Sequence, residues 1–110
     1  MHVLESVKEA WKFIYANEVV LLAYVNTEED LGRFVVELLK GLERVSRNYI
    51  AFAIYKVNNK HGGRPVITLY IRGRQVFRQQ DYFGNYVKDL QALKWGIRET
   101  LREWGIEPPF

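Results

Sequence analysis

Aromatic, cationic and amide side chains are concentrated in one stretch of the sequence, from Tyr70 to Lys88, which reads YIRGRQVFRQQDYFGNYVK. Arginine and lysine residues alternate here with tyrosine and phenylalanine rings, and glutamine and asparagine amides lie between them. Cations neutralise the phosphates of a nucleic acid and flat rings stack on its bases, so this combination is typical of proteins that bind single strands. The stretch therefore predicts a partner that is single-stranded DNA or RNA.

A second basic and aromatic set lies on the helix that we expect over residues 88–104. Lys88, Lys94, Trp95, Arg98 and Arg102 recur at helical spacing and share one face. Both segments together form the predicted nucleic-acid-binding site. Its residues are Tyr70, Arg72, Arg74, Phe77, Arg78, Tyr82, Phe83, Lys88, Lys94, Trp95, Arg98 and Arg102.

An opposing interpretation places the hairpin rings in the core. In that case the first helix would cover them through Trp11, Ile14 and Tyr15, and the arginines would only be solvated. Aromatic residues make up 15% of the chain, which is enough to supply such a core. The sequence leaves both interpretations open.

No residue set in the chain predicts catalysis, a cofactor or a metal site. There is no cysteine, which excludes thiolate chemistry and disulfides, and the two histidines, His2 and His61, are far apart in sequence. The acidic run Glu28, Glu29 and Asp30 is explained by its expected position at a helix start, where the helix dipole favours carboxylates. We therefore expect a protein that is not an enzyme.

Length and composition indicate one globular domain over residues 1–110. Hydrophobic residues make up 48% of the chain, and the longest apolar run, Val19–Val25, is far shorter than the roughly 18 residues of a membrane span. The first residues do not resemble a secretion signal, so we expect a cytoplasmic protein with no membrane partner. The net charge of +3 is mild, so the positions of the charges matter more than their sum.

Hydrophobic periodicity predicts the element order α-β-α-β-β-β-α, which is an α/β fold with helices packed on a mixed four-stranded sheet. Asn85 is expected to cap the last helix and Gly105 to end it, while Thr27 is expected to cap the second helix. The expected helices cover about residues 3–17, 27–47 and 88–104, and the expected strands cover residues 19–25, 48–57, 66–71 and 75–80.

Alternation along the last two strands assigns their side chains to two faces, and similar patterns assign the buried sides of the helices. Ile67, Leu69, Ile71 and Val76 fall on a core face, whereas Tyr70 and Phe77 fall on a mixed face with Arg72 and the neighbouring glutamines. A tight turn at RGR joins the two strands. The buried stripe of the last helix is expected to contain Val87, Leu90, Leu93, Ile97, Leu101 and Trp104.

Two segments resemble the thioredoxin fold. VVLLAYVNTEEDLGRFVVELL is similar to the central strand and active-site helix of that family, and Arg64 to Tyr70, RPVITLY, is similar to its proline-led strand. Glu29-Asp30-Leu31-Gly32 stands where the family has its CxxC pair, so the resemblance implies a scaffold without redox activity. The helix that the family has between the second and third strands is replaced by NNKHGG.

This resemblance implies a second function, the binding of a polypeptide partner. The polypeptide would lie in a groove beside Pro65 or pair with an edge of the sheet. Pro65 would be either the cis proline of the family or an ordinary proline at the start of a strand.

In composition and layout the chain is also similar, more loosely, to small archaeal single-stranded-DNA-binding proteins of the ThermoDBP kind. Its last residues, IEPPF, are similar to the tip by which bacterial single-strand-binding proteins recruit partners. Trp95, Trp104 and Phe110 are large apolar residues near this end, and they predict a homodimer in which they are buried between subunits.

Overall fold

Five strands form one mixed sheet at the centre of the structure, a computed structural model that describes residues 1–46, 49–58 and 63–110. The strand order is β1-β3-β2-β4-β5; the first three of these strands are parallel, and β4 and β5 are antiparallel to their neighbours. The α/β class is confirmed, with one strand more than expected. The strands are β1 (His2–Leu4), β2 (Val19–Val25), β3 (Ala51–Lys56), β4 (Val66–Ile71) and β5 (Arg74–Gln79).

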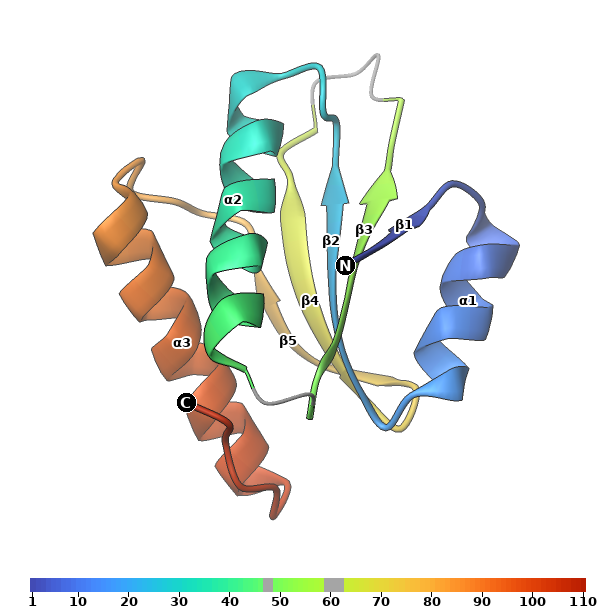
Figure 1. Cartoon of the computed structure of the whole chain (residues 1–110), viewed down its shortest axis with the longest axis vertical. Helices are drawn as coiled ribbons and strands as arrows, with labels where there is room; N and C mark the ends of the chain where they lie inside the picture. The colour runs from blue at the N-terminus through green and yellow to red at the C-terminus, as the bar shows by residue number, and fades with distance from the viewer. Residues whose placement is uncertain (47–48, 59–62) are drawn as a thin grey trace.

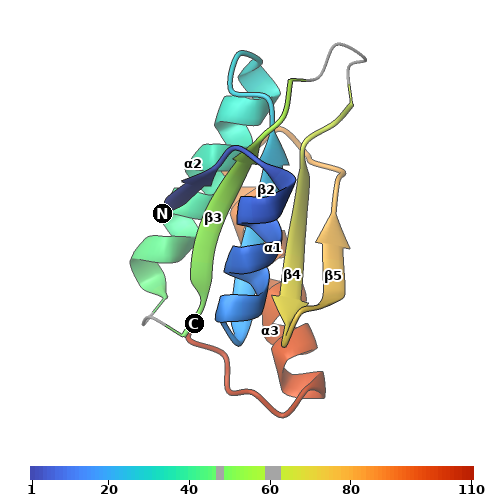
Figure 2. The same ribbon diagram turned by 90° about the vertical axis from the view of Figure 1, so that its right-hand side faces the viewer.

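Three helices cover the two faces of the sheet unequally in the described part of the chain (Figure 1). Two of them, α2 and α3, pack side by side on one face, and α1 lies on the other face (Figure 2). Residues 57–58 and 63–65, which belong to the connection from β3 to β4, contain no helix. The helices are α1 (Val7–Ala16), α2 (Asp30–Val45) and α3 (Tyr86–Glu103).

The additional strand β1 occupies residues that we expected to begin the first helix. Ser6 delays the helix, because its hydroxyl accepts a hydrogen bond from the Glu9 amide at 3.1 Å and so caps α1. The Glu9 carboxylate in turn accepts from the Glu5 amide at 2.8 Å. Residues before this cap are extended and pair with β3, where His2 lies opposite Ala53.

Strand β2 is central and buried on both faces, as its apolar run predicts. Leu21 and Ala23 face α2 and α3, whereas Val20 and Leu22 face α1. On the α1 side the neighbouring strand β3 contributes Ala53 to the same cluster of buried residues.

The second helix begins later than expected and without a side-chain cap. Thr27 does not cap it; the cap position is Glu29, and the Asn26 side chain instead accepts a hydrogen bond from the Glu28 amide at 3.0 Å. This hydrogen bond forms a local turn before the helix, and no side chain caps the helix itself. The strand expected from Asn48 begins at Ala51, and Asn48 itself lies outside the described residues.

The β4–β5 hairpin has the expected two-residue turn at Arg72-Gly73, with φ angles of 51° and 81°. The strand pairing contains a shift, because Leu69 lies opposite Phe77 while the next residue, Tyr70, lies opposite Gln75. Such a bulge moves the following side chain to the other face. Phe77 therefore lies on the core side with Leu69, and its expected place on the mixed face is wrong.

The last helix starts and ends at the expected signals. The Asn85 side chain accepts from the Lys88 amide at 3.0 Å, and Gly105, with φ 72°, ends the helix in the left-handed conformation. The Ile106 amide then donates to the Leu101 carbonyl at 2.9 Å. None of the helices in the described ranges is long and apolar enough to cross a lipid bilayer.

Candidate ligand-binding site

The hairpin ring of Tyr70 belongs to the core and not to a binding surface. It is 6% exposed and packs with Ile14 and Ala10 beneath α1. Its hydroxyl shares a hydrogen bond of 2.7 Å with the hydroxyl of Tyr24. The stacking role predicted for Tyr70 is therefore wrong, since the first helix covers the ring as the opposing interpretation expects.

Phe77 also packs inside the fold. A β-carbon on Gly96 of α3 would lie 2.5 Å from Cε1 of the Phe77 ring, so the helix touches the ring where it has no side chain. The ring is partly buried against the core that α2 and α3 cover. Phe77 is thus a packing residue between β5 and α3.

Tyr82 links the segment after β5 to the start of β4. Its hydroxyl lies 2.8 Å from the Pro65 carbonyl and 3.1 Å from the Gln79 carbonyl, and donates to these acceptors. Burial, followed by the negative charge of Asp89, raises the pKa of the Tyr82 hydroxyl above its ordinary value. A ring fixed in this way supports the loop and does not offer a free face to a base.

The predicted arginines of the hairpin are dispersed. The Arg72 guanidinium pairs with Glu18 at 3.7 Å, while Arg74 and Arg78 are exposed on β5. Arg102, on α3, pairs with Glu99 at 2.9 Å. Two of these four cations are therefore engaged in ion pairs, and Arg102 lies on a different element from the three hairpin arginines.

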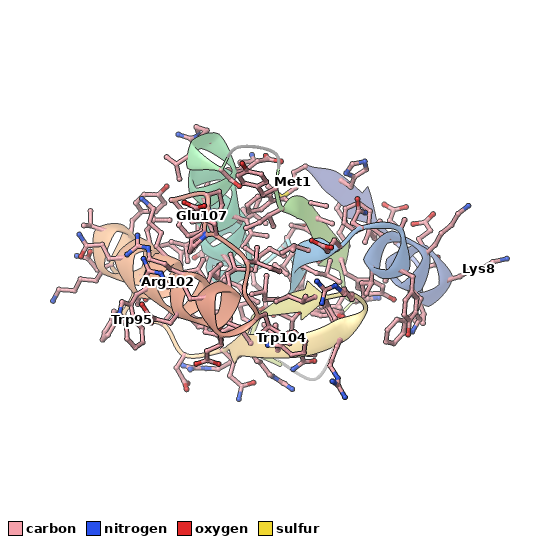
Figure 3. The ribbon with its side chains drawn as sticks, turned by 90° about the horizontal axis from the view of Figure 1, so that it is seen from below. Met1, Lys8, Trp95, Arg102, Trp104 and Glu107 are labelled. Carbon is pink, nitrogen blue, oxygen red and sulfur yellow. The ribbon has the colours of Figure 1, made fainter. Side chains whose placement is uncertain are left out.

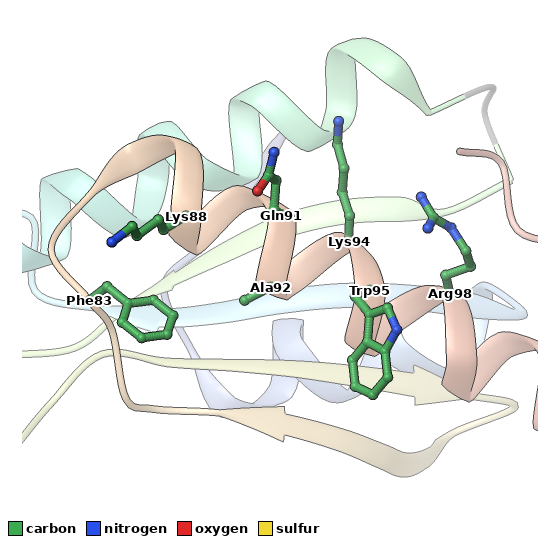
Figure 4. Close-up of a pocket in the computed structure, with 7 residues that line it drawn as sticks. All are labelled: Phe83, Lys88, Gln91, Ala92, Lys94, Trp95 and Arg98. Atoms are coloured by element: carbon green, nitrogen blue, oxygen red, sulfur yellow. The ribbon is translucent and has the colours of Figure 1, made fainter.

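Five of the predicted residues do lie together around a hollow of about 650 Å³ on the outer side of α3 (Figure 4). Phe83 is 73% exposed and Trp95 is 65% exposed, so both rings are available to a ligand. The cations lie along the same helix between and beside the rings. The residues that line the hollow are Phe83, Lys88, Gln91, Ala92, Lys94, Trp95 and Arg98.

Phe83 is held at the hollow by Asp89, a residue that the sequence interpretation did not include in the site. The carboxylate of Asp89 is fully buried and accepts from the Phe83 amide at 2.7 Å and from the Gly84 amide at 2.9 Å. In the first turn of α3 it is therefore Asp89 that faces inward, while Val87, expected in the buried stripe, is exposed. The sequence signal for this arrangement is an aspartate four residues after the Asn85 cap, together with Gly84 immediately before that cap.

Arg98 connects the hollow to the last residues of the chain. Its Nε donates to the Phe110 carbonyl at 3.0 Å. Phe110, Ile106 and Trp104 pack partly against the core. Of the three aromatic residues expected between subunits, Trp95 alone is largely exposed, and the homodimer stays a prediction.

The lining of the hollow contains three cations and no carboxylate. Such a surface attracts anionic groups, and its two exposed rings provide apolar or stacking contacts. Within the described residues, no three histidine, aspartate or glutamate side chains are grouped as metal ligands. The arrangement is therefore suited to binding an anionic ligand that has apolar or flat groups.

The start of α2, where the resemblance places the redox site, has a different chemistry. Glu29 and Gly32 occupy the two positions that would be thiols, and Gly32 is buried directly against the Asn26 carbonyl. Pro65 is buried and trans, because the described part of the chain has no cis peptide bond. Its carbonyl is occupied by Tyr82, so the start of β4 is tied to the fold.

No protein-family model matches the sequence, and no curated protein matches it either. Solved thioredoxins do resemble the structure. Plasmodium falciparum thioredoxin has a TM-score of 0.70 at 15% identity, covering 90% of this chain and 98% of that chain. Mitochondrial thioredoxin 3 from Saccharomyces cerevisiae has a TM-score of 0.69 at 16% identity, covering 90% and 94%.

A mutant thioredoxin from Halobacterium salinarum has a TM-score of 0.64 at 16% identity, covering 86% of this chain and 88% of that chain. At these identities the likeness shows the fold alone, and the fold is thioredoxin-like without cysteine. The expected thioredoxin-like architecture is confirmed. The looser resemblance to single-stranded-DNA-binding proteins of the ThermoDBP kind has no support from these structures.

Proposed function

We propose that this protein is a redox-inactive thioredoxin-like scaffold that binds an acidic segment of a polypeptide partner in the hollow on α3. The observation that carries the proposal is the pair of exposed rings, Phe83 and Trp95, beside Lys88, Lys94 and Arg98, with no carboxylate in the lining. The rings accept apolar side chains and the cations attract carboxylates. Function then consists of binding, without a chemical step.

The absence of cysteine supports the redox-inactive part of the proposal. Disulfide exchange requires a thiolate that attacks a sulfur atom, and the chain has no thiol to supply one. At the start of α2, Gly32 lies against a backbone carbonyl and leaves no room for another nucleophilic side chain at this position.

The length of the hollow favours a short polypeptide segment over a long nucleic-acid strand. From Lys88 to Arg98 the helix rises roughly 15 Å, at 1.5 Å per residue. Proteins that bind single strands without sequence preference use a basic groove that follows several nucleotides. Here the predicted cations outside the hollow are paired, as Arg72 and Arg102 are, or lie on β5.

Single-stranded nucleic acid is the second candidate ligand for the same hollow. The specific observation in its favour is the exposure of both rings, because unstacked bases need free aromatic faces. Three cations would neutralise about three phosphates and give a log–log salt slope of about −2. A short oligonucleotide would therefore bind weakly and lose affinity as the salt concentration rises.

Fluorescence polarisation with three labelled probes separates these candidates. The probes are an extended peptide of glutamate and phenylalanine containing proline, the same peptide with glutamine for glutamate, and oligothymidine. We expect the acidic peptide to bind more tightly than the other two. Trp95→Ala should weaken its binding by roughly 2 kcal/mol, since aromatic anchors dominate such interfaces.

Tyr49→Ala is the matched control, because Tyr49 is also largely exposed but lies outside the lining of the hollow. It should leave the affinity for the acidic peptide unchanged. Tighter binding of oligothymidine than of the acidic peptide, lost in Trp95→Ala, would replace the polypeptide by nucleic acid. Equal affinity of the acidic and glutamine peptides would contradict the role given to the cations.

A further inference from the structure

The solvent-facing flank of α1 carries a row of large apolar side chains. Val7, Trp11 and Tyr15 are 62%, 46% and 69% exposed, and they recur every four residues, so they form one continuous ridge along the helix. The Trp11 and Tyr15 rings stack with centroids 5.6 Å apart and an interplanar angle of 22°. The helix buries Ala10 and Ile14 in place of these residues. We call Val7, Trp11 and Tyr15 the α1 ridge.

The α1 ridge borders a part of the sheet with less helical cover. Its last member, Tyr15, lies on the turn of the β4–β5 hairpin, where a β-carbon on Gly73 would be 2.5 Å from the Tyr15 ring. On this face α1 is the only helix in the described part of the chain (Figure 2). Within the described residues, no second helix therefore lies beside the ridge on this face.

Cations frame the α1 ridge. Lys8 and Lys12 are exposed, and each follows a ridge residue by one position, about 100° further around the helix. Arg74, also exposed, begins β5 beside the hairpin turn. Glu18, which follows α1, is paired with Arg72 at 3.7 Å, so its charge is partly compensated. Glu9 is exposed on α1 too, but it lies about 160° around the helix from Trp11, so the charges beside the ridge are cationic and complement a ligand with negative charge.

From this apolar ridge framed by cations, we infer that α1 docks an amphipathic helix of a partner polypeptide, with acidic residues beside the apolar stripe of that helix. Ridges of residues four apart are the surfaces through which two helices commonly interlock. Docking of an amphipathic helix through regularly spaced apolar anchors is a recurrent mode of polypeptide recognition. The inference goes beyond the proposed function and does not depend on it, because Lys8 and Trp95 lie at opposite ends of the molecule (Figure 3).

A second copy of this chain fits the α1 ridge less well. If two copies packed through their ridges, Lys8 and Lys12 of both would be brought to the same interface, and like charges oppose such contact. Nucleic acid also fits less well, because Trp11 and Tyr15 already stack on each other, which leaves less ring surface free for bases. An acidic helix satisfies both the apolar and the charged parts of the surface.

The test is a fluorescence-anisotropy titration with two labelled helical peptides. Both carry leucine at i, i+4 and i+7; one has glutamate and the other has lysine at the flanking positions. We expect the glutamate peptide to bind more tightly. Trp11→Ser should weaken its binding by about tenfold or more, and Lys12→Glu should reverse the preference between the two peptides.

Each titration is repeated in a Trp95→Ala background, so that binding in the hollow on α3 is not mistaken for binding to α1. Circular dichroism melts should show that Trp11→Ser and Lys12→Glu remain folded, because both side chains are exposed. Failure to bind either peptide, equal affinity for both, or an unchanged affinity of Trp11→Ser would overturn the inference. So would a dimer in sedimentation that Trp11→Ser converts to monomer, or oligothymidine binding that Trp11→Ser removes.

Discussion

The ring of Phe77 lies against Gly96, so that strand β5 and helix α3 meet where the helix lacks a side chain. This contact determines what Phe77→Ala should do. The change removes a partly buried ring from the packing between β5 and α3, and we expect the free energy of unfolding to fall by about 3 kcal/mol. Denaturant unfolding measures this loss of stability. The affinity of the folded variant for an acidic peptide is measured separately, in the absence of denaturant.

Gly96→Ala is the reciprocal change. Its methyl group would lie 2.5 Å from the ring, so we expect destabilisation by roughly 1 to 3 kcal/mol. The double variant Phe77→Ala with Gly96→Ala should be more stable than the sum of the two losses implies, since the smaller side chain at position 77 makes room for the methyl group. A Phe77→Ala protein of unchanged stability that has lost ligand affinity would show instead that the ring is a binding platform.

The Phe77 contact also shows where sequence reasoning reaches its limit. Alternation places Val76 with the core and Phe77 with the polar face, which holds for a regular strand pair. The register shift between Leu69 and Tyr70 breaks that regularity, and nothing in the hairpin sequence marks it. The continuous apolar run Val19–Val25, by contrast, predicts its burial correctly, because every residue of the run supports the same interpretation.

Sequence reasoning identified only the part of the candidate site that lies on one regular helix. Helical spacing gathers Lys88, Lys94, Trp95 and Arg98 on one face of α3, and in the structure these four residues line one hollow. The side to which each hairpin ring turns depends on tertiary packing, which spacing does not contain. Only Phe83, held by its backbone to Asp89, joins the helix residues at the hollow.

The second prediction concerns the cations of the hollow. Lys94 lines the hollow, whereas Arg102 lies outside its lining and is paired with Glu99. Lys94→Ala should therefore weaken binding of an acidic peptide and reduce its salt dependence, because one attractive charge is lost from a partly screened site. With oligothymidine the log–log salt slope should become less steep by about 0.7.

Arg102→Ala is the matched control for Lys94→Ala. It removes the same formal charge from the same helix, but we expect little change in affinity or salt slope. Equal effects of the two variants would mean that net charge, and not the hollow, governs binding. Titrations at several salt concentrations give both quantities.

The third prediction concerns redox chemistry. The protein should not reduce insulin disulfides, because it has no thiol. Glu29→Cys with Gly32→Cys restores the family's CxxC spacing, yet we expect this variant to remain without reductase activity and to lose stability. A side chain at position 32 would collide with the Asn26 carbonyl, so the helix start would have to move.

Glu29→Cys alone is the control, since position 29 is exposed and accommodates a side chain. Its thiol should react with a standard thiol reagent while the protein keeps its melting temperature. Efficient insulin reduction by the double variant would show that the start of α2 is more adaptable than the contact between Gly32 and Asn26 implies.

The last prediction concerns pH and the hydroxyl of Tyr82. Burial raises the pKa of this hydroxyl above the unfolded value of about 10, so the folded state holds its proton more tightly than the unfolded state does. The resulting stabilisation is fully present below about pH 10 and is lost as the pH rises toward the folded pKa. Tyr82→Phe removes this titration together with the hydrogen bonding to the Pro65 and Gln79 carbonyls.

At neutral pH, Tyr82→Phe should therefore lower the free energy of unfolding by about 1 kcal/mol, as expected for a lost hydrogen bond. Above about pH 10 the difference between the wild type and the variant should shrink, because the ionised form of Tyr82 is favoured in the unfolded wild type. Urea unfolding of both proteins near neutral pH and at about pH 11 measures the difference, and other alkaline titrations shared by the two proteins cancel. A difference that stays constant or grows over this interval would show that Tyr82 ionises as readily in the folded state as in the unfolded state, and that its hydroxyl is not held by the two carbonyls.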